Sequence, residues 1–364
     1  MYKKIALIVL LTASVFIFSC SKGGNANNNK EANGFEIAVL IDLGPIDDKS
    51  FNQGSWEGVK EYAEHHGISY KYYRVPDKDI DSYMNTIDLA VKGGAKLIVT
   101  PGYMFEPAIY KAQDIYTNVH FILIDGEPQD GTYTDYKTSP NTSAILYSEE
   151  EAGFLAGYAI VKEGYTNLGF MGGVAHPAVV RFGYGFVQGA EYAAVEAKLP
   201  KNSVDIKYTY VGNYDPTPEN QTLATSWYKS GVQVIFAAAG AAGNSVMSAA
   251  ENNNGLVIGV DVDQSFESPT VITSAMKMIR ESVYNSVASY YNGNFVGGKT
   301  SILNAQVNGI GLPMVTSKFK VFTDEDYNII YDSLVKRTIK VLKDTDAENA
   351  EKLPLNIVKV HYIK

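Results

Sequence analysis

The stretch Gly44-Pro45-Ile46-Asp47-Asp48-Lys49-Ser50-Phe51-Asn52-Gln53 lies between a strand-like run, residues 36–42, and an amphipathic helical segment. It follows the acidic residue Asp42 and combines a Gly-Pro turn, three charged side chains, an aromatic ring and two amides. Its last residues open a helix, where free backbone N–H groups gather. The stretch therefore predicts a loop that holds a ligand with a flat apolar face and a polar rim.

Around this loop, short apolar runs alternate with segments of helical periodicity. The runs are rich in β-branched or aromatic residues and bounded by Gly, Asp or Pro, which is typical of buried parallel strands. We expect strands at 37–41, 70–75, 97–100, 121–125, 168–171, 206–211, 234–238, 257–261 and 271–274. Helices are expected from Ser50, as a cap, to Gly67, and over 80–92, 106–116, 149–161, 179–196 and 277–291. The alternation, which restarts after residue 143, predicts two similar α/β lobes with parallel sheets.

Ligands of open parallel sheets bind beyond the carboxyl ends of the strands. The residues at those ends are therefore the candidate site. They comprise three carboxylates, several glycine turns and a lysine: Asp42, Thr100-Pro101-Gly102, Asp125-Gly126, Gly172-Gly173, Ala239-Gly240, Asp261 and the run from Ser274 to Lys277.

Composition limits the possible partners. The 364 residues are 46% hydrophobic and 20% charged, which suits a globular protein with two domains of about 100–200 residues. The formal net charge is −9, and no block of basic residues occurs. Both features argue against a nucleic-acid partner.

The N-terminus has the pattern of an export signal: Lys3 and Lys4 precede an apolar run over 5–18. Cys20 is the only cysteine, so no intramolecular disulfide is expected. Residues 17–20 resemble a bacterial lipobox, which implies cleavage before Cys20 and lipidation of its thiol, with palmitate as an expected acyl group. A non-lipidated signal cut further along is the alternative. Residues 21–33 are expected to form a flexible tether.

Several motifs that could suggest catalysis do not fit their structural context. Gly293 to Thr300 matches the phosphate-loop pattern, but it follows a helical segment instead of a strand, so we interpret it as a surface turn leading into irregular chain. Asp47-Asp48 and Asp261-Val262-Asp263 could be metal-binding or acid/base carboxylates, but hard cations take 6–8 oxygen ligands and no stretch concentrates them. We favour the interpretation in which Asp48 is a local cap or ion-pair partner and Asp42 and Asp261 bind ligand hydroxyls. No metal, cofactor or catalytic nucleophile is expected.

Two aromatic residues at helix starts could face each other across the lobes. Phe51 and Phe182 would then form a clamp for a planar group, or both rings could belong to the core; the sequence leaves this open. Phe186, one turn further on, is expected in the core. His176 could line the cleft or be solvated.

Together, several motifs in order resemble the basic membrane protein family, substrate-binding lipoproteins of ABC transporters typified by the purine nucleoside receptor. They are the lipobox, 44–53, 121–126, 150–157, 185–189 and 258–264. The resemblance implies a type I periplasmic-binding-protein fold, with two Rossmann-like lobes joined by a multi-strand hinge and a nucleoside between them. The expected lobes are 35–143 plus about 264–305, and 144–263 plus about 306–364, after a signal peptide over 1–19 and a tether over 20–34.

The resemblance also implies roles for individual residues. Asp42 and Asn52 would bond polar edges of the ligand, Phe51 and Phe182 would sandwich the base, and Asp125 would read it. Gly240, Asp261 and Lys277 would bind the ribose side. The implied partners are inosine, guanosine or adenosine and a membrane permease, and the protein is expected to be a monomer without enzymatic activity. It would be lipid-anchored to the cell membrane and face the periplasm or the cell exterior.

Three other functions remain open at this point. Riboflavin is also a flat ring with a hydroxylated tail and could be the ligand. A nucleoside hydrolase, which uses clustered aspartates, belongs to a different class. A surface adhesin or antigen role could coexist with binding.

Overall fold

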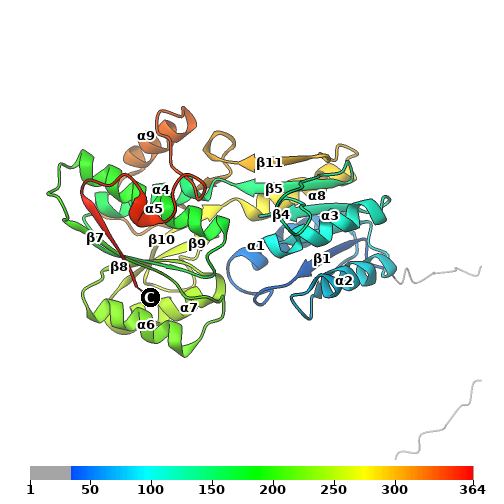
Figure 1. Cartoon of the computed structure of the whole chain (residues 1–364), viewed down its shortest axis with the longest axis horizontal. Coiled ribbons are helices and arrows are strands. Elements are labelled where there is room, and N and C mark those ends of the chain that lie inside the picture. The colour runs from blue at the N-terminus through cyan, green and yellow to red at the C-terminus, as the bar shows by residue number, and fades with distance from the viewer. Residues whose placement is uncertain (1–33, 364) are drawn as a thin grey trace, which may run out of the picture. The chain divides into compact units, whose positions relative to one another are not determined.

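The computed structural model describes residues 34–363 (Figure 1). The signal peptide, Cys20 and most of the tether predicted from the sequence lie outside the described residues. Within residues 34–363, no helix has both the length and the apolar character needed to cross a bilayer.

Two sheets organise this part of the chain, as predicted. The first has the order β11-β5-β4-β3-β1-β2, and all of its neighbouring strands run parallel. Its strands are β1 (Ile37–Ile41), β2 (Tyr70–Arg74), β3 (Leu97–Pro101), β4 (His120–Ile124), β5 (Thr142–Tyr147) and β11 (Lys299–Leu303). β2 is an edge strand with partly exposed side chains, although a buried strand was expected.

The second sheet has the order β12-β10-β9-β8-β6-β7-β13, and only the β10–β12 pair is antiparallel. Its strands are β6 (Asn167–Gly172), β7 (Val204–Tyr210), β8 (Val234–Ala238), β9 (Leu256–Asp261), β10 (Val271–Lys277), β12 (Ile310–Gly311) and β13 (Val358–Tyr362). Each sheet thus forms the centre of one lobe.

Helices cover the sheets because both faces of the central strands are apolar. In β1, Ile37 and Val39 pack in the cluster that contains Val59 of α1, whereas Leu40 packs with Ile87 of α2. The helices are α1 (Phe51–His66), α2 (Ile80–Lys92), α3 (Glu106–Ile115), α4 (Glu149–Lys162), α5 (Pro177–Glu196), α6 (Pro218–Lys229), α7 (Gly243–Asn253), α8 (Ile279–Tyr291) and α9 (Asp324–Val335). Short 3-10 turns are η1 (Tyr103–Phe105), η2 (Gly240–Ala242), η3 (Ala305–Val307) and η4 (Ala350–Lys352).

The chain passes between the two sheets after β5, after β10 and after β11. These crossings differ from the lobe boundaries expected from the sequence. β5 belongs to the first sheet, although a boundary at 143 assigned most of it to the second lobe. β10 belongs to the second sheet, where it pairs with β9, although 264–305 was expected in the first lobe. At each crossing, the chain leaves a sheet only after the preceding strand has paired with its neighbour in that sheet. The pattern of apolar residues does not show which sheet a strand joins.

Three local predictions can be compared with the structure. Gly67 ends α1 in the left-handed conformation, with φ 64°, as predicted for a C-terminal glycine. The phosphate-loop-like stretch over 293–300 joins α8 to β11 and opens no helix, as expected, but it leads into a strand and not into irregular chain. Lys277 was placed at the start of a helix, whereas it is the last residue of β10.

Four glycines bring α4 and α5 into backbone contact. Gly153 and Gly157 lie one turn apart on α4, and Gly185 and Gly189 do so on α5. A Cβ atom added to Gly157 would lie 2.0 Å from the carbonyl oxygen of Phe186, and one added to Gly189 would lie 1.9 Å from that of Phe154. The helix pair therefore has no room for a methyl group at these positions. This contact fixes the start of α5, where Phe182 lies, against the start of α4.

We predict that Gly157→Ala destabilises the protein by about 1–3 kcal/mol, because overpacking outweighs the higher helix propensity of alanine. Chemical denaturation measures the loss. Gly243→Ala is the control, because a Cβ there would meet its nearest neighbour at 3.8 Å. Equal stability of both variants would contradict the close helix contact.

Candidate functional site

A cavity lies where the carboxyl ends of the strands of the two sheets face each other. The space between the atoms that line it amounts to about 720 Å³, including the part open to solvent. The structure brings all eight residues predicted for the site to its lining: Asp42, Phe51, Asn52, Asp125, Phe182, Gly240, Asp261 and Lys277.

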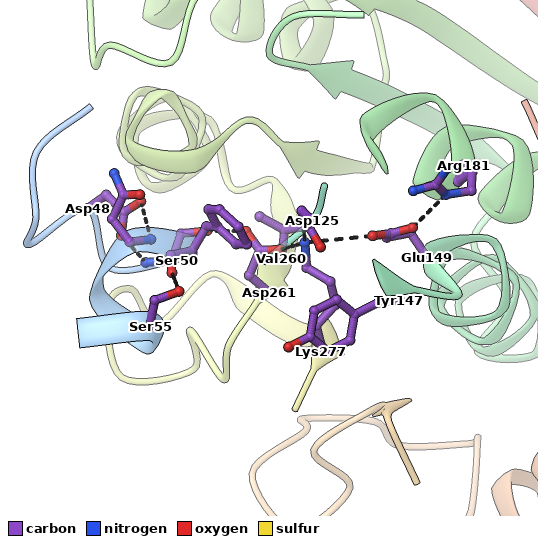
Figure 2. Close-up of polar contacts among 12 residues, drawn as sticks. Asp48, Ser50, Ser55, Asp125, Tyr147, Glu149, Arg181, Val260, Asp261 and Lys277 are labelled. Atoms are coloured by element: carbon purple, nitrogen blue, oxygen red, sulfur yellow. Dashed lines mark hydrogen bonds and ion pairs between the residues drawn. The ribbon is translucent and has the colours of Figure 1, made fainter. Parts of the chain in front are cut away.

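Lys277 is the centre of the charged end of this cavity. Its ammonium lies 2.5 Å from Oδ2 of Asp125 and 3.0 Å from Oδ1 of Asp261, with Oε1 of Glu149 at 3.9 Å. Figure 2 shows Glu149 reaching on to Arg181, whose Nε donates to Oε2 of Glu149 at 2.6 Å. The side chain of Lys277 is 3% exposed, so this cation is almost fully withdrawn from water.

Burial and neighbouring charges both shift the pKa values of these groups. Burial lowers the pKa of Lys277, but the carboxylates of Asp125, Asp261 and Glu149 outweigh burial and raise it overall. Burial raises the pKa of Asp125 to about 7; Lys277 opposes this shift, and Glu149 and Asp261 add to it. Oδ1 of Asp125 is buried and has no hydrogen-bond partner among the described residues. Asp125 lines the cavity, so a ligand donor placed beside this oxygen would supply the partner that it lacks.

The two aspartates that contact Lys277 share an uncommon backbone conformation. Asp125 has φ 55° and Asp261 has φ 68°, and they lie at the ends of β4 and β9. Non-glycine residues adopt this left-handed region rarely, and it persists where surrounding contacts enforce it. Here the ion pairs with Lys277 hold both carboxylates at the strand ends.

Phe51 and Phe182 flank the same lysine. Lys277 Nζ lies 4.6 Å from the ring centroid of Phe51 and 5.5 Å from that of Phe182, within the range of cation–π contacts. Phe182 also packs edge to face on Phe236, with centroids 5.8 Å apart. It therefore belongs to the core and lines the cavity at once. Phe186 is fully buried in the core, as predicted.

The loop over 44–53 is held by its own polar groups. The carboxylate of Asp48 accepts hydrogen bonds from the backbone N–H groups of Ser50, Asn52 and Gln53, at 2.9 to 3.0 Å, which confirms its interpretation as a local cap. Ser50 was expected to cap the helix, but its side chain makes no capping bond. Its hydroxyl instead donates to Oδ2 of Asp261 at 2.6 Å.

Asn52 stabilises the loop and also lines the cavity. Its Nδ2 donates to the carbonyl oxygens of Leu43 at 2.6 Å and Pro45 at 3.1 Å. The amide oxygen is therefore the atom by which Asn52 could contact a ligand. Nearby, Asp42 accepts a hydrogen bond from the hydroxyl of Tyr83 at 3.0 Å, and burial raises its pKa.

Among the other residues that line the cavity, three carry rings and were not among the eight predicted site residues: Tyr103, His176 and Tyr214. The alternative in which His176 is solvated is wrong, because its ring lines the cavity and stacks on Tyr103. Burial lowers the pKa of His176 to about 3, with Lys277 and Arg181 adding to the shift, so the ring is neutral at pH 7. Tyr103 directly follows the strand end at Gly102, so extending that rule by one residue would have found it.

Within residues 34–363, no group of three or more His, Cys, Asp or Glu side chains is arranged to hold a metal ion. The positive charge between the carboxylates is that of Lys277. Hydroxyl groups of a ligand, which donate and accept hydrogen bonds, suit this mixture of carboxylates and ammonium.

Comparison with known proteins gives a consistent result. Residues 35–347 match the family described as ABC transporter substrate-binding protein PnrA-like. Basic membrane protein D of Borreliella burgdorferi (strain JD1) is 29% identical over 354 residues, which cover 94% of this chain and 96% of that protein. The ABC transporter nucleoside-binding protein BmpA of Lactococcus lactis subsp. cremoris (strain MG1363) is 26% identical over 341 residues, which cover 87% and 92%.

Among solved structures, an ABC transporter solute-binding protein from Aeropyrum pernix K1 superposes with a TM-score of 0.73 at 22% identity. The superposition covers 87% of this chain and 95% of that one. It confirms the predicted fold, an α/β fold of the type I periplasmic-binding kind.

We predict that Lys277→Met destabilises the protein by about 3–5 kcal/mol near pH 8, because it leaves buried carboxylates without their cation. The pKa of Asp125 then rises further above its unfolded value of about 3.9. When a carboxyl has a higher pKa in the folded than in the unfolded state, the folded protein loses stability as the pH rises above the unfolded-state pKa. The destabilisation by Lys277→Met is therefore smaller near pH 5 than near pH 8.

Denaturant titrations at the two pH values measure this difference. Lys336→Met, which removes an exposed partner of Asp332 on α9, is the control and is expected to cost about 0.5 kcal/mol or less. A loss for Lys277→Met that is independent of pH would contradict the ionised state of the cluster.

Proposed function

Because this chain belongs to the PnrA-like family of ABC transporter substrate-binding proteins, as the resemblance of its motifs predicted, we propose that it captures a purine nucleoside between its lobes for uptake. The family binds a transported substrate and does not convert it. The observation that carries the proposal is the cavity itself, in which a buried cluster of Lys277, Asp125 and Asp261 adjoins the rings of Phe51 and Phe182. One relative, that of L. lactis, is named as nucleoside-binding.

Two neighbouring groups of residues in the cavity suit the two parts of a nucleoside. Ribose hydroxyls can donate to the carboxylates and accept from the ammonium of the cluster around Lys277. The base then lies near Phe51 and Phe182, where aromatic contact favours a planar ring. Gly240, with φ 52°, lines the cavity wall in the second lobe.

We propose a different role for Asp125 from the one that the family resemblance implied. It was expected to read the base, but its 2.5 Å contact with Lys277 groups it with the hydroxyl-binding end. We therefore propose that Asp125 contacts the hydroxyl groups of the sugar. Asp42 and Asn52, which follow β1 and lie further from the crossings between the lobes, contact the polar edge of the base.

Contacts between the lobes favour the closed arrangement. Ser50 donates to Asp261, Gln264 Nε2 donates to the carbonyl oxygen of Lys49 at 2.8 Å, and Lys49 forms an ion pair with Glu267. A ligand that contacts both lobes shifts the population towards this form by its higher affinity for it. An ABC permease then recognises the closed monomer.

The proposed site of action is outside the cytoplasm, with Cys20 lipidated and the tether linking the lobes to the membrane. Each buried methylene of an acyl chain contributes about 0.8 kcal/mol to membrane binding. The alternative ligand is riboflavin, and the alternative class is a nucleoside hydrolase.

Calorimetric titration with inosine, guanosine, adenosine, cytidine, riboflavin and ribose tests the proposed function, with chromatography of the recovered ligand. Purine nucleosides are expected to bind saturably and to be recovered intact, and ribose to bind far more weakly. Tighter binding of riboflavin would show that riboflavin, and not a purine nucleoside, is the ligand. Accumulation of free base and ribose would show that the protein is a hydrolase.

We predict that Phe51→Ala weakens purine nucleoside binding by about 1–3 kcal/mol through lost stacking and burial. The same titration measures this effect. Phe266→Ala is the matched control, since that ring is 82% exposed and does not line the cavity. An unchanged affinity of Phe51→Ala would show that Phe51 does not contribute to ligand binding.

We predict that Cys20→Ser abolishes labelling by radioactive palmitate, because the variant has no thiol to carry an acyl chain. Metabolic labelling followed by immunoprecipitation measures this effect. A variant that is still labelled would contradict the anchor at Cys20.

A further inference from the structure

Two rings stack across the two lobes at the wall of the cavity. Tyr103 opens η1, just beyond β3 of the first sheet, and His176 precedes α5 in the second lobe. Their ring centroids lie 4.5 Å apart with an interplanar angle of 28°. Both residues line the cavity, so the stack is part of its boundary.

The strand order places this stack away from the hinge. In the first sheet, β4 separates β3 from the crossing strand β5; in the second sheet, β9 and β8 separate β6 from the crossing strand β10. The charged cluster, by contrast, draws on β4, β9 and β10, close to the crossings. When two lobes rotate about a hinge, contacts far from it separate furthest. The stack is therefore a contact that opening must break.

The surroundings of the stack suit a contact that opens and closes. His176 also lies beside Tyr214, with ring centroids 6.1 Å apart, so its ring has a partner in its own lobe. Tyr103 follows Gly102, whose φ of 117° is open to glycine but strained for other residues. No side-chain hydrogen bond between described residues joins Tyr103 to His176, and ring stacking is a weak, reversible interaction.

We propose that Tyr103 and His176 form a gate that closes the cavity at its end far from the hinge and sets how fast a bound ligand leaves. The inference rests on the proposed capture of a nucleoside. The gate acts on the rate of release, whereas the cluster around Lys277 and the ring of Phe51 act on recognition.

Stopped-flow measurement of nucleoside release tests the gate with Tyr103→Ala, His176→Ala and the double variant. Each single variant is expected to release ligand about 3- to 10-fold faster, because the stack is lost. The double variant should be little faster than either single one, since both substitutions remove the same contact. His65→Ala, an exposed position in the last turn of α1, is the control and should release at the wild-type rate.

Conservative variants separate a gate from a polar contact with the ligand. Tyr103→Phe and His176→Phe keep a flat ring and should restore slow release. If His176→Phe releases as fast as His176→Ala, the imidazole bonds the ligand and the gate is wrong. Wild-type release rates in the alanine variants would also overturn the gate while leaving the proposed function intact.

Small-angle X-ray scattering of the ligand-free protein gives a readout that needs no ligand. The alanine variants should populate a more open form than the wild type, because the closed form has lost a contact between the lobes. Scattering identical to that of the wild type would overturn the gate. Failure of the wild type to bind any nucleoside would instead overturn the proposed function, and scattering would still decide the gate.

Discussion

The ammonium of Lys277, buried among the carboxylates of Asp125, Asp261 and Glu149, is the interaction on which the rest of the site depends. A buried charge without partners costs several kcal/mol, and so does each buried carboxylate. The cost is offset only when the ends of β4, β9 and β10 and the start of α4 meet around one point. Because β4 belongs to the first sheet and β9 and β10 to the second, this constraint also ties the two lobes together at the cavity.

The close packing of α4 on α5 supplies the opposite side of this cluster. Glycines in both helices allow their backbones to touch, which places Glu149 at the start of α4 beside Arg181 near the start of α5. Phe182 follows Arg181 and reaches the cavity from the same turn. The helix contact, the ion pairs and the aromatic wall are thus consequences of one arrangement, in which apolar packing positions charges that could not be buried singly.

The sequence predicted the alternating α/β elements well because both faces of the central strands are apolar. It also predicted the cavity residues at strand ends, such as Asp42, Asp125 and Asp261, because the carboxyl ends of parallel strands meet at one edge. Which side chains form hydrogen bonds with each other could not be predicted in the same way. Ser50 has the local chemistry of a helix cap, yet it bonds Asp261, 211 positions away in the chain.

Glu149 was missed for a related reason. Its position in the first turn of a helix is explained by the helix dipole alone, so nothing in the local sequence marks it as a partner of Lys277. The lobe boundaries failed where a strand completes its pairing before the chain crosses, as β10 does. These are properties of the assembled sheets and not of any segment.

The binding of 2′,3′-dideoxyinosine compared with that of inosine tests most directly whether the cluster around Lys277 binds the hydroxyls of a nucleoside. Loss of both hydroxyls would leave Asp125 and Lys277 without ligand partners in a dry site, so binding should weaken by about 100-fold or more. Equal affinities in calorimetric titration would contradict the assignment of this end of the cavity to ribose.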